Sequence, residues 1–234
     1  MPRQPRVNLP NVPQHIIQRG NNRHICFYQN SDYPVYLDKL KEYAQKYDVQ
    51  IHAFVLMTNH VHLLMTPKTE QGISQLMQSL GRFYVRYINN HYNRTGTLWE
   101  GRYKAALVDT EHYFLKVSKY IELNPVRAKM VKHPASYPWS SYQGNALDKE
   151  IRLLTPHACY INLGNTQEKR KANYRALFND EIDQYSIQQI REFTNKSWVL
   201  GSDKFLKQIE EQLGRDISIA KHGGDRRSQE FKGK

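Results

Sequence analysis

Two histidines, two residues apart, interrupt an apolar stretch of the chain. The stretch reads Met57-Thr58-Asn59-His60-Val61-His62-Leu63-Leu64-Met65. Because side chains alternate between the faces of a β-strand, a strand here places His60 and His62 on one face and Val61, Leu63 and Met65 on the other. Two imidazoles on one open surface can bind a metal ion, and they can equally be ordinary surface or hydrogen-bonded residues. The pair alone leaves both interpretations open.

A second candidate group lies in the segment Glu111 to Asn124. This segment has a helical apolar face, and Tyr120 and Asn124, four residues apart, share an adjoining face. Pro125 ends the regular pattern, because it lacks an N–H and restrains the residue before it. Read locally, Asn124 caps a following short helix that has Pro125 at its first position, and Tyr120 is an ordinary packing aromatic.

Residue spacing also predicts the elements that must position these side chains. Apolar residues with a period of two indicate strands, and those with a period of three to four indicate helices. In the strand 49–57 we expect Ile51, Ala53 and Val55 to share one face. The predicted elements are a strand at 12–19, a turn at 20–23, a helix at 31–47, strands at 49–57 and 60–67, a helix at 73–88, a strand at 103–108 and a helix from about 110.

This order of elements predicts an α+β fold. Strand, helix, strand, strand, helix, strand, helix fits a ferredoxin-like or RRM-like split βαβ antiparallel sheet with helices on one face. Beyond about Pro138 the pattern weakens into shorter helical stretches, including 184–194 and 204–213. We expect residues 1–145 to form the main domain with a basic N-terminal arm, 146–220 a small helical C-terminal region and 221–234 a disordered basic tail.

The composition favours a polyanionic partner. The chain has 34 Lys and Arg against 22 Asp and Glu, a net charge of +12, and 16 Tyr, 3 Trp and 8 Phe that could stack on unpaired bases. Charge alone also fits a membrane surface or a ribosomal role. No stretch approaches the roughly 20 apolar residues that span a bilayer. Cys26 and Cys159 lack a metal or redox spacing, and no secretory signal is evident, so we expect a cytoplasmic, nucleoid-associated protein.

Four segments of the chain together resemble a known family. They are His15-Ile16-Ile17-Gln18-Arg19-Gly20-Asn21-Asn22-Arg23, residues 53–67 around the histidine pair, Leu98-Trp99-Glu100-Gly101-Arg102-Tyr103-Lys104, and Tyr120-Ile121-Glu122-Leu123-Asn124-Pro125-Val126-Arg127-Ala128. Tyr137-Pro138-Trp139-Ser140-Ser141-Tyr142 follows them. In order and spacing, over roughly residues 1–145, the chain resembles the HUH-superfamily single-tyrosine transposases, and among these the REP-associated tyrosine transposases (RAYT).

The resemblance implies a site and an activity. His60 and His62 become ligands of a divalent metal with Asn124 as the third, and Tyr120 becomes the nucleophile that attacks single-stranded DNA. Mg²⁺ or Mn²⁺ is expected, and Zn²⁺ is the competing ion. The implied protein is a metal-dependent single-stranded DNA endonuclease and strand transferase, a transposase that forms a 5′-phosphotyrosine on hairpin DNA such as repetitive extragenic palindromes (REP). The alternatives are a replication-initiator or relaxase-type HUH nuclease and a non-catalytic RRM-like DNA-binding or RNA-binding protein.

Two segments supply candidate DNA contacts. Basic residues near the N-terminus could follow a phosphate backbone, and an interleaved aromatic and basic segment could hold a single strand. A solvated arm and a core position for the tryptophan are the alternatives. We expect a monomer with its tyrosine acting in cis, and a homodimer that exchanges the catalytic helix is the alternative. The candidates are Arg3, Arg6, Arg19, Asn21, Arg23, Trp99, Arg102 and Lys104.

Overall fold

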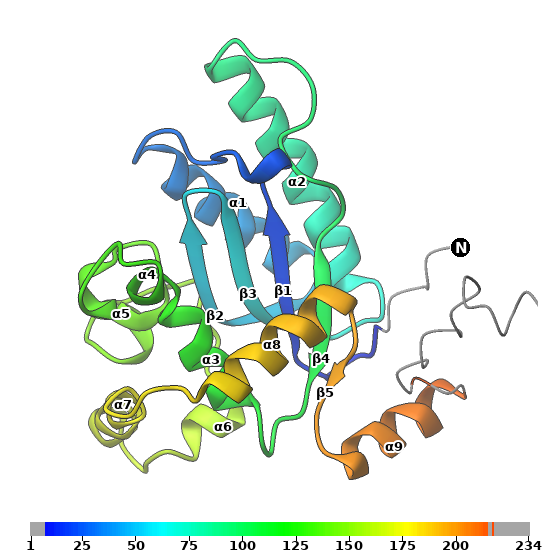
Figure 1. The fold of residues 1–234 in the computed structure, drawn as a ribbon, viewed down its shortest axis with the longest axis vertical. Coiled ribbons are helices and arrows are strands. Elements are labelled where there is room, and N and C mark those ends of the chain that lie inside the picture. The colour runs from blue at the N-terminus through cyan, green and yellow to red at the C-terminus, as the bar shows by residue number, and fades with distance from the viewer. Residues whose placement is uncertain (1–7, 215–216, 218–234) are drawn as a thin grey trace, which may run out of the picture.

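The computed structural model describes residues 8–214 and residue 217 (Figure 1). The candidates Arg3 and Arg6 and the predicted tail 221–234 lie outside the described residues. The strands are β1 (Gln14–Arg19), β2 (Val49–Met57), β3 (His60–Pro67), β4 (Lys104–Val108) and β5 (Val199–Leu200). The helices are η1 (Asn21–Arg23), α1 (Asp32–Lys46), α2 (Gly72–His91), α3 (Phe114–Glu122), α4 (Asn124–Arg127), η2 (Pro134–Ser136), α5 (Tyr142–Asn145), α6 (Ala158–Ile161), α7 (Gln167–Ala176), α8 (Gln184–Lys196) and α9 (Asp203–Leu213).

The strands form one sheet in the order β2-β3-β1-β4-β5. β1 lies in the middle and pairs antiparallel with β3 and with β4, and β2 pairs antiparallel with β3. The predicted α+β fold and its order of elements are confirmed. One strand departs from the antiparallel expectation: β5 follows α8 and pairs parallel with β4, so the whole sheet is mixed.

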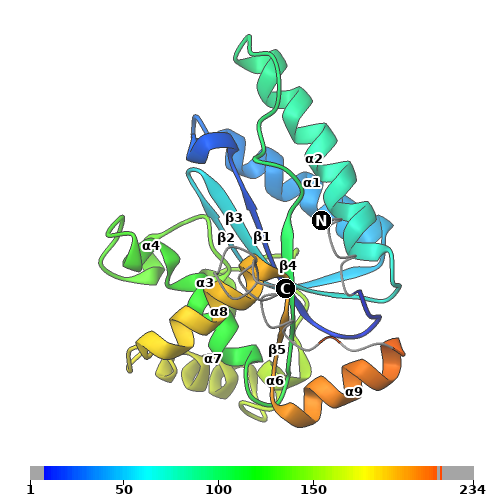
Figure 2. The ribbon, with the colours of Figure 1, turned by 45° about the vertical axis from the view of Figure 1, so that its right-hand side comes forward.

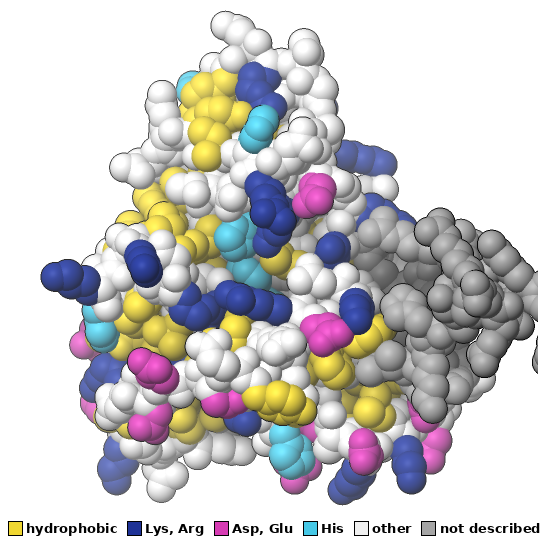
Figure 3. Space-filling model, viewed as in Figure 1, with side chains coloured by type: hydrophobic (Ala, Val, Ile, Leu, Met, Phe, Trp, Pro, Cys, Tyr) yellow, Lys and Arg dark blue, Asp and Glu magenta, His cyan; other side chains and the backbone are white. Residues whose placement is uncertain are grey.

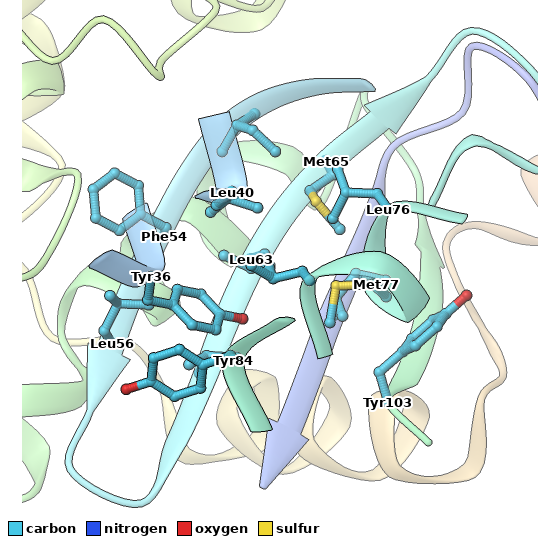
Figure 4. Close-up of a cluster of buried hydrophobic side chains, with 14 of the residues drawn as sticks. Tyr36, Leu40, Phe54, Leu56, Leu63, Met65, Leu76, Met77, Tyr84 and Tyr103 are labelled. Carbon is cyan, nitrogen blue, oxygen red and sulfur yellow. The ribbon is translucent and has the colours of Figure 1, made fainter. Parts of the chain in front are cut away.

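α1 and α2 cover one face of this sheet. Figure 4 shows Tyr36 and Leu40 of α1 and Leu76 and Tyr84 of α2 packed around Leu63 of β3, and all five side chains are buried. Burying one such side chain stabilises the fold by about 1.5–3 kcal/mol. The alternating pattern predicted for the strand that carries the histidines is confirmed, since Val61, Leu63 and Met65 all join this core.

α3 and α8 cover the opposite face, as Figures 1 and 2 show. Val117 of α3 and Ile190 of α8 are fully buried in one cluster with Ala53, Val55 and Leu64 of the sheet. The expectation of helices on one face is therefore wrong. β2 and β3 carry apolar residues on both faces, and a sheet apolar on both faces must be covered on both.

A β-bulge in β2 explains how one strand serves both cores. Ile51 pairs with Met65 and Ala53 pairs with Leu64, so the register shifts at His52 between them. Ile51 consequently packs under α1 and α2, whereas Ala53 lies on the opposite face. The expectation that Ile51, Ala53 and Val55 share a face is wrong, because an extra residue in a strand reverses the alternation beyond it.

Residues beyond 145 pack directly on this sheet. α8 contacts β1 and β4, and β5 extends the sheet edge. α9 closes that edge through Ile209, which lies in a cluster with Leu9, Leu107 and Val199. The boundary expected at residue 145 stays a prediction, but α8 and β5 share the core of the main sheet.

A buried carboxyl group fastens the end of α3 to the residues that follow it. Glu122 is fully buried and accepts hydrogen bonds from Ser141 Oγ, Asn145 Nδ2 and Tyr174 Oη. Burial raises the pKa of Glu122 to about 7, and the three donors act in the opposite direction. The folded protein therefore holds a proton on Glu122 at pH values where an exposed glutamate is ionised.

Glu122 predicts a specific pH dependence of stability. Its pKa is about 7 in the folded protein against an ordinary value of 4.5, so the folded state binds the extra proton between these values. The free energy of unfolding should fall across this window as the pH rises, by on the order of 3 kcal/mol, and stay level above it. We expect E122Q to lose this slope when wild type and variant are compared by urea denaturation from pH 4.5 to 8.

Comparing wild type with E122Q isolates the contribution of Glu122 to the pH dependence of stability, because the other titrating groups are the same in both proteins. Glu181 is exposed and offers a matched control, since E181Q should leave the wild-type slope unchanged. Parallel stability curves for wild type and E122Q would contradict the assignment.

Candidate active site

Both histidines of the pair lie on the face of β3 that α3 and α8 cover. In the strand register His60 pairs with Arg19 and His62 pairs with Ile17 of β1. The predicted shared face is thus observed, because both rings line one cavity of about 290 Å³ while Val61 between them lies in the opposite core. In Figure 3 histidine side chains lie in the middle of this face, with Lys and Arg side chains around them.

Hydrogen bonds to Asn59 define the tautomer of the His60 imidazole. Its Nδ1 lies 2.6 Å from Oδ1 of Asn59, and an amide oxygen can only accept. The amide orientation follows from its other end, because Nδ2 of Asn59 donates to the carbonyl of Arg23 at 3.0 Å. Nδ1 of His60 therefore carries the hydrogen, and Nε2 keeps a lone pair for a ligand.

Burial keeps the imidazoles of the cavity uncharged. It lowers the pKa of His60 to about 4 and the pKa of His62 well below the ordinary value, because a charged ring loses its hydration there. The positive charges of Arg19 and Arg127 act in the same direction. Both rings are neutral at neutral pH, which is the form that binds metal ions.

Tyr120 reaches the same cavity from α3. Its ring meets the rings of His15 and His62 edge-on, with centroids 5.8 Å apart in both cases. The guanidinium of Arg127 lies over the ring, 4.1 Å from its centroid. Burial lowers the pKa of Arg127 to about 10, so it remains a cation at neutral pH. The ring of Tyr120 thus contacts the imidazoles of His15 and His62 and the positive charge of Arg127.

Asn124 follows one helical turn later and lines the cavity as well. Its Nδ2 donates to the carbonyls of Tyr120 and Ile121, both at 3.1 Å, and its Oδ1 accepts from Arg127 at 2.8 Å. The expected cap of the helix beginning at Pro125 is wrong, since the amide turns back and satisfies the last turn of α3 instead. One lone pair of Oδ1 remains for another partner.

These donors fit a divalent ion. They comprise two imidazole nitrogens and an amide oxygen, a neutral set that leaves the charge of the ion intact. In the part of the chain that the structure describes, no group of three or more His, Cys, Asp or Glu could hold a metal. A metal site here would therefore need an oxygen ligand of another residue type, and Asn124, the predicted third ligand, lines the cavity.

The predicted DNA-binding residues lie in different parts of the structure, some at the cavity and others away from it. Arg19 lines the cavity, and the exposed Arg23 and half-buried Asn21 follow it in η1 at the end of β1. Arg102 is exposed beside α2, whereas Lys104 of β4 donates to Asn195 of α8, which lines the cavity.

Trp99 is the exception among these candidates. Its ring is buried in the core beside α1 and α2, stacked on Tyr84 at 6.0 Å between centroids. Its prediction as a platform for bases is corrected, because a buried indole offers no free face to a base. The core alternative is the one observed.

Sequence reasoning missed several residues of the cavity. Arg127, Arg191 and Thr194 line it, and the last two belong to α8, far from the other site residues in sequence. His15 lines it as well, and here a signal existed: His15, Ile17 and Arg19 alternate along β1 and share one face.

A histidine pair on β3 faces a tyrosine from α3, which packs across that strand, as the resemblance to the HUH-type transposases implies. Residues 8–124, which are half of the chain, match the model of the family described as IS200-like transposases. The chain belongs to the IS200-like transposase family. The predicted resemblance is thereby confirmed.

One solved structure shows the same fold. The REP-associated tyrosine transposase bound to a REP hairpin covers 67% of this chain and 99% of its own, with a TM-score of 0.53 and 16% identity. A candidate transposase from Deinococcus radiodurans R1 covers 51% of this chain and 95% of its own, with a TM-score of 0.37 and 23% identity. Among curated proteins none matches this chain. Within the described residues, no helix has the length and apolar character needed to cross a membrane.

The position of Trp99 gives a prediction that separates stability from DNA binding. W99F should lower the free energy of unfolding by about 1–3 kcal/mol, because it leaves space in a packed core. DNA affinity should stay within about twofold, whereas loss of a stacked base costs about 1–3 kcal/mol. Urea denaturation and fluorescence anisotropy with a labelled hairpin would measure the two effects.

Proposed function

We propose that this transposase is a divalent-metal-dependent single-stranded DNA endonuclease and strand transferase that acts through a 5′-phosphotyrosine on hairpin DNA. The observation that carries the proposal is the meeting of Tyr120 with His60, His62 and Asn124 in one cavity. A tyrosine beside a set of neutral metal ligands has the parts needed for nucleophilic attack on a phosphodiester.

His60, His62 and Asn124 would hold the ion. Bound there, a divalent ion supplies positive charge to a non-bridging phosphate oxygen and orients the phosphate. The neutral donors suit this role, since carboxylate ligands would cancel part of that charge. Mn²⁺ tolerates imidazole better than Mg²⁺ does, so we expect either ion to serve and Mn²⁺ to bind more tightly.

Tyr120 would perform the transfer. Its phenol oxygen forms a bond to phosphorus while the bond from phosphorus to the 3′ oxygen breaks, and the phenol hydrogen is matched by the hydrogen that the leaving oxygen gains. The products are a 5′-phosphotyrosine and a free 3′-hydroxyl. Arg127 lies over the ring at 4.1 Å and favours the negative charge that develops on the phenol oxygen.

The basic residues around the cavity support an anionic, single-stranded substrate. Arg19, Arg127 and Arg191 line it, and Arg23 follows beyond β1. A positively charged groove of this kind tracks a phosphate backbone. The REP-associated relative was solved with a REP hairpin, which supports hairpin DNA as the substrate class.

The same geometry supports action in cis by a monomer. Tyr120 meets His62 of its own chain, so the cavity is completed without an exchanged helix. A DNA substrate also fits the proposed location at the nucleoid in the cytoplasm. Membership of the transposase family argues against a replication-initiator or relaxase-type nuclease, and a non-catalytic DNA-binding or RNA-binding protein is the alternative that the adduct test addresses.

A covalent adduct tests the nucleophile. Wild-type protein incubated with hairpin oligonucleotides and Mn²⁺ should form a denaturant-resistant protein–DNA adduct with a free 3′-hydroxyl on the released strand, and Y120F should form none. The exposed Tyr185 provides the control, because Y185F should retain the adduct. An adduct in Y120F would refute the assignment, and binding without any adduct in the wild type would favour the non-catalytic alternative.

Metal binding can be tested without DNA. Isothermal titration of metal-free protein with Mn²⁺ should show one site. H60A should weaken Mn²⁺ binding by more than about 10–100-fold, the loss typical when a residue that hydrogen-bonds a metal ligand is replaced. The half-exposed His112 lies outside the cavity, so H112A should bind Mn²⁺ like the wild type. Equal affinity in H60A and wild type would remove His60 from the ligand set.

A further inference from the structure

A chain of three buried hydrogen bonds runs from α8 to the second histidine of the pair. Thr194 Oγ1 lies 2.7 Å from the carbonyl of Ile190, His15 Nδ1 lies 2.8 Å from Thr194 Oγ1, and His15 Nε2 lies 2.9 Å from His62 Nδ1. Thr194, His15 and His62 are each at most 3% exposed. Water therefore does not replace these contacts, and every hydrogen in the chain must have an assigned place.

The first bond fixes the direction of the others. A carbonyl only accepts, so the single hydroxyl hydrogen of Thr194 is donated to Ile190. Thr194 Oγ1 can then only accept from His15, which places the hydrogen of His15 on Nδ1. Since a neutral imidazole has one hydrogen, Nε2 of His15 must accept, and Nδ1 of His62 must donate.

His62 is left with one nitrogen that carries a lone pair, Nε2. His15 is 1% exposed and its two nitrogens contact a hydroxyl and an imidazole, so no acidic partner stabilises a second hydrogen on that buried ring. In the reverse tautomer of His62, the hydroxyl of Thr194 would have to donate to His15 and abandon the carbonyl of Ile190. Thr194 therefore biases His62 toward the tautomer that presents Nε2.

His60 reaches the same tautomer through a different partner, the amide of Asn59. Two independent contacts thus present the same nitrogen from both rings. The rings of His15 and His62 are stacked, with centroids 5.1 Å apart and planes 14° apart, so the contact also fixes the orientation of His62.

We propose that Thr194 and His15 are positioning residues that hold His62 in its metal-binding tautomer and orientation, so that α8 forms part of the metal site. Thr194 lies beyond residues 8–124, the part of the chain that matches the family model. The expected effect on metal affinity rests on the proposed function. The tautomer of His62 does not, because it can be measured in metal-free protein. Contacts of this kind typically change metal affinity by about 10–100-fold.

The test combines a tautomer measurement with metal affinity. T194V removes the hydroxyl and keeps the shape of the side chain, and T194S restores the hydroxyl. In metal-free wild type, long-range ¹H–¹⁵N NMR should show His62 with its hydrogen on Nδ1, and T194V should show a mixture or the reverse tautomer. Mn²⁺ affinity measured by titration should fall about 10–100-fold in T194V and recover in T194S.

Thr66 supplies the matched control, because it is a buried threonine whose Oγ1 contacts His52 Nε2 outside the cavity. T66V should leave both the His62 tautomer and the Mn²⁺ affinity unchanged. Wild-type His62 with its hydrogen on Nε2 would overturn the proposal, and so would T194V with wild-type tautomer and affinity. If wild type binds no Mn²⁺ at all, the proposed function fails, but the tautomer measurement still tests whether Thr194 and His15 set the tautomer of His62.

Discussion

Each imidazole of the pair has two nitrogens, and the site depends on which partner forms a hydrogen bond with Nδ1, the nitrogen that is not presented to a ligand. Leaving a buried donor or acceptor without a partner costs about 1–3 kcal/mol, so each ring of the pair requires a defined neighbour. His60 uses Asn59 in the β2–β3 turn, and His62 uses His15 of β1. The requirement that stabilises the folded chain thereby also determines which nitrogen faces the cavity.

Because of this constraint, the face of the sheet that carries the cavity needs two helices, α3 and α8, which lie far apart in the sequence. α3 brings Tyr120, and the buried Glu122 at its end fastens that helix to residues 141–174. α8 brings Thr194, whose contact with His15 joins residues 179 positions apart in sequence. The catalytic chemistry we propose thus needs the C-terminal helices for geometry, although the histidines and the tyrosine lie within the first 124 residues.

Local periodicity could predict the order of the elements and which residues share a face, whereas the roles of the candidate site residues come from the resemblance to the HUH transposases. A period of two places His60 and His62 on one face, and a spacing of four places Tyr120 of α3 and Asn124 of α4 on the same side, as observed. The bulge at His52 escaped prediction because no glycine or proline marks it, and its cause is tertiary: the ring is held by Thr155 and Thr66. The role of Thr194 could not be predicted for the same reason, because its partner His15 is distant in sequence. For Trp99 the sequence leaves two alternatives open, a base platform and a core position, and only the packing on Tyr84 decides between them.

The charge balance of the cavity follows from the same set of residues. No acidic side chain is among the described residues that line it, whereas Arg19, Arg127 and Arg191 are. Low-dielectric surroundings strengthen the attraction of these cations for a phosphate, because solvent screens them less than at an open surface. Arg127 binds the amide oxygen of Asn124 and covers the ring of Tyr120, so one fixed charge is shared between the proposed ligand and the proposed nucleophile. A phosphate that enters between them meets positive charge from the protein itself, and a divalent ion on neutral ligands adds to that charge rather than replacing it.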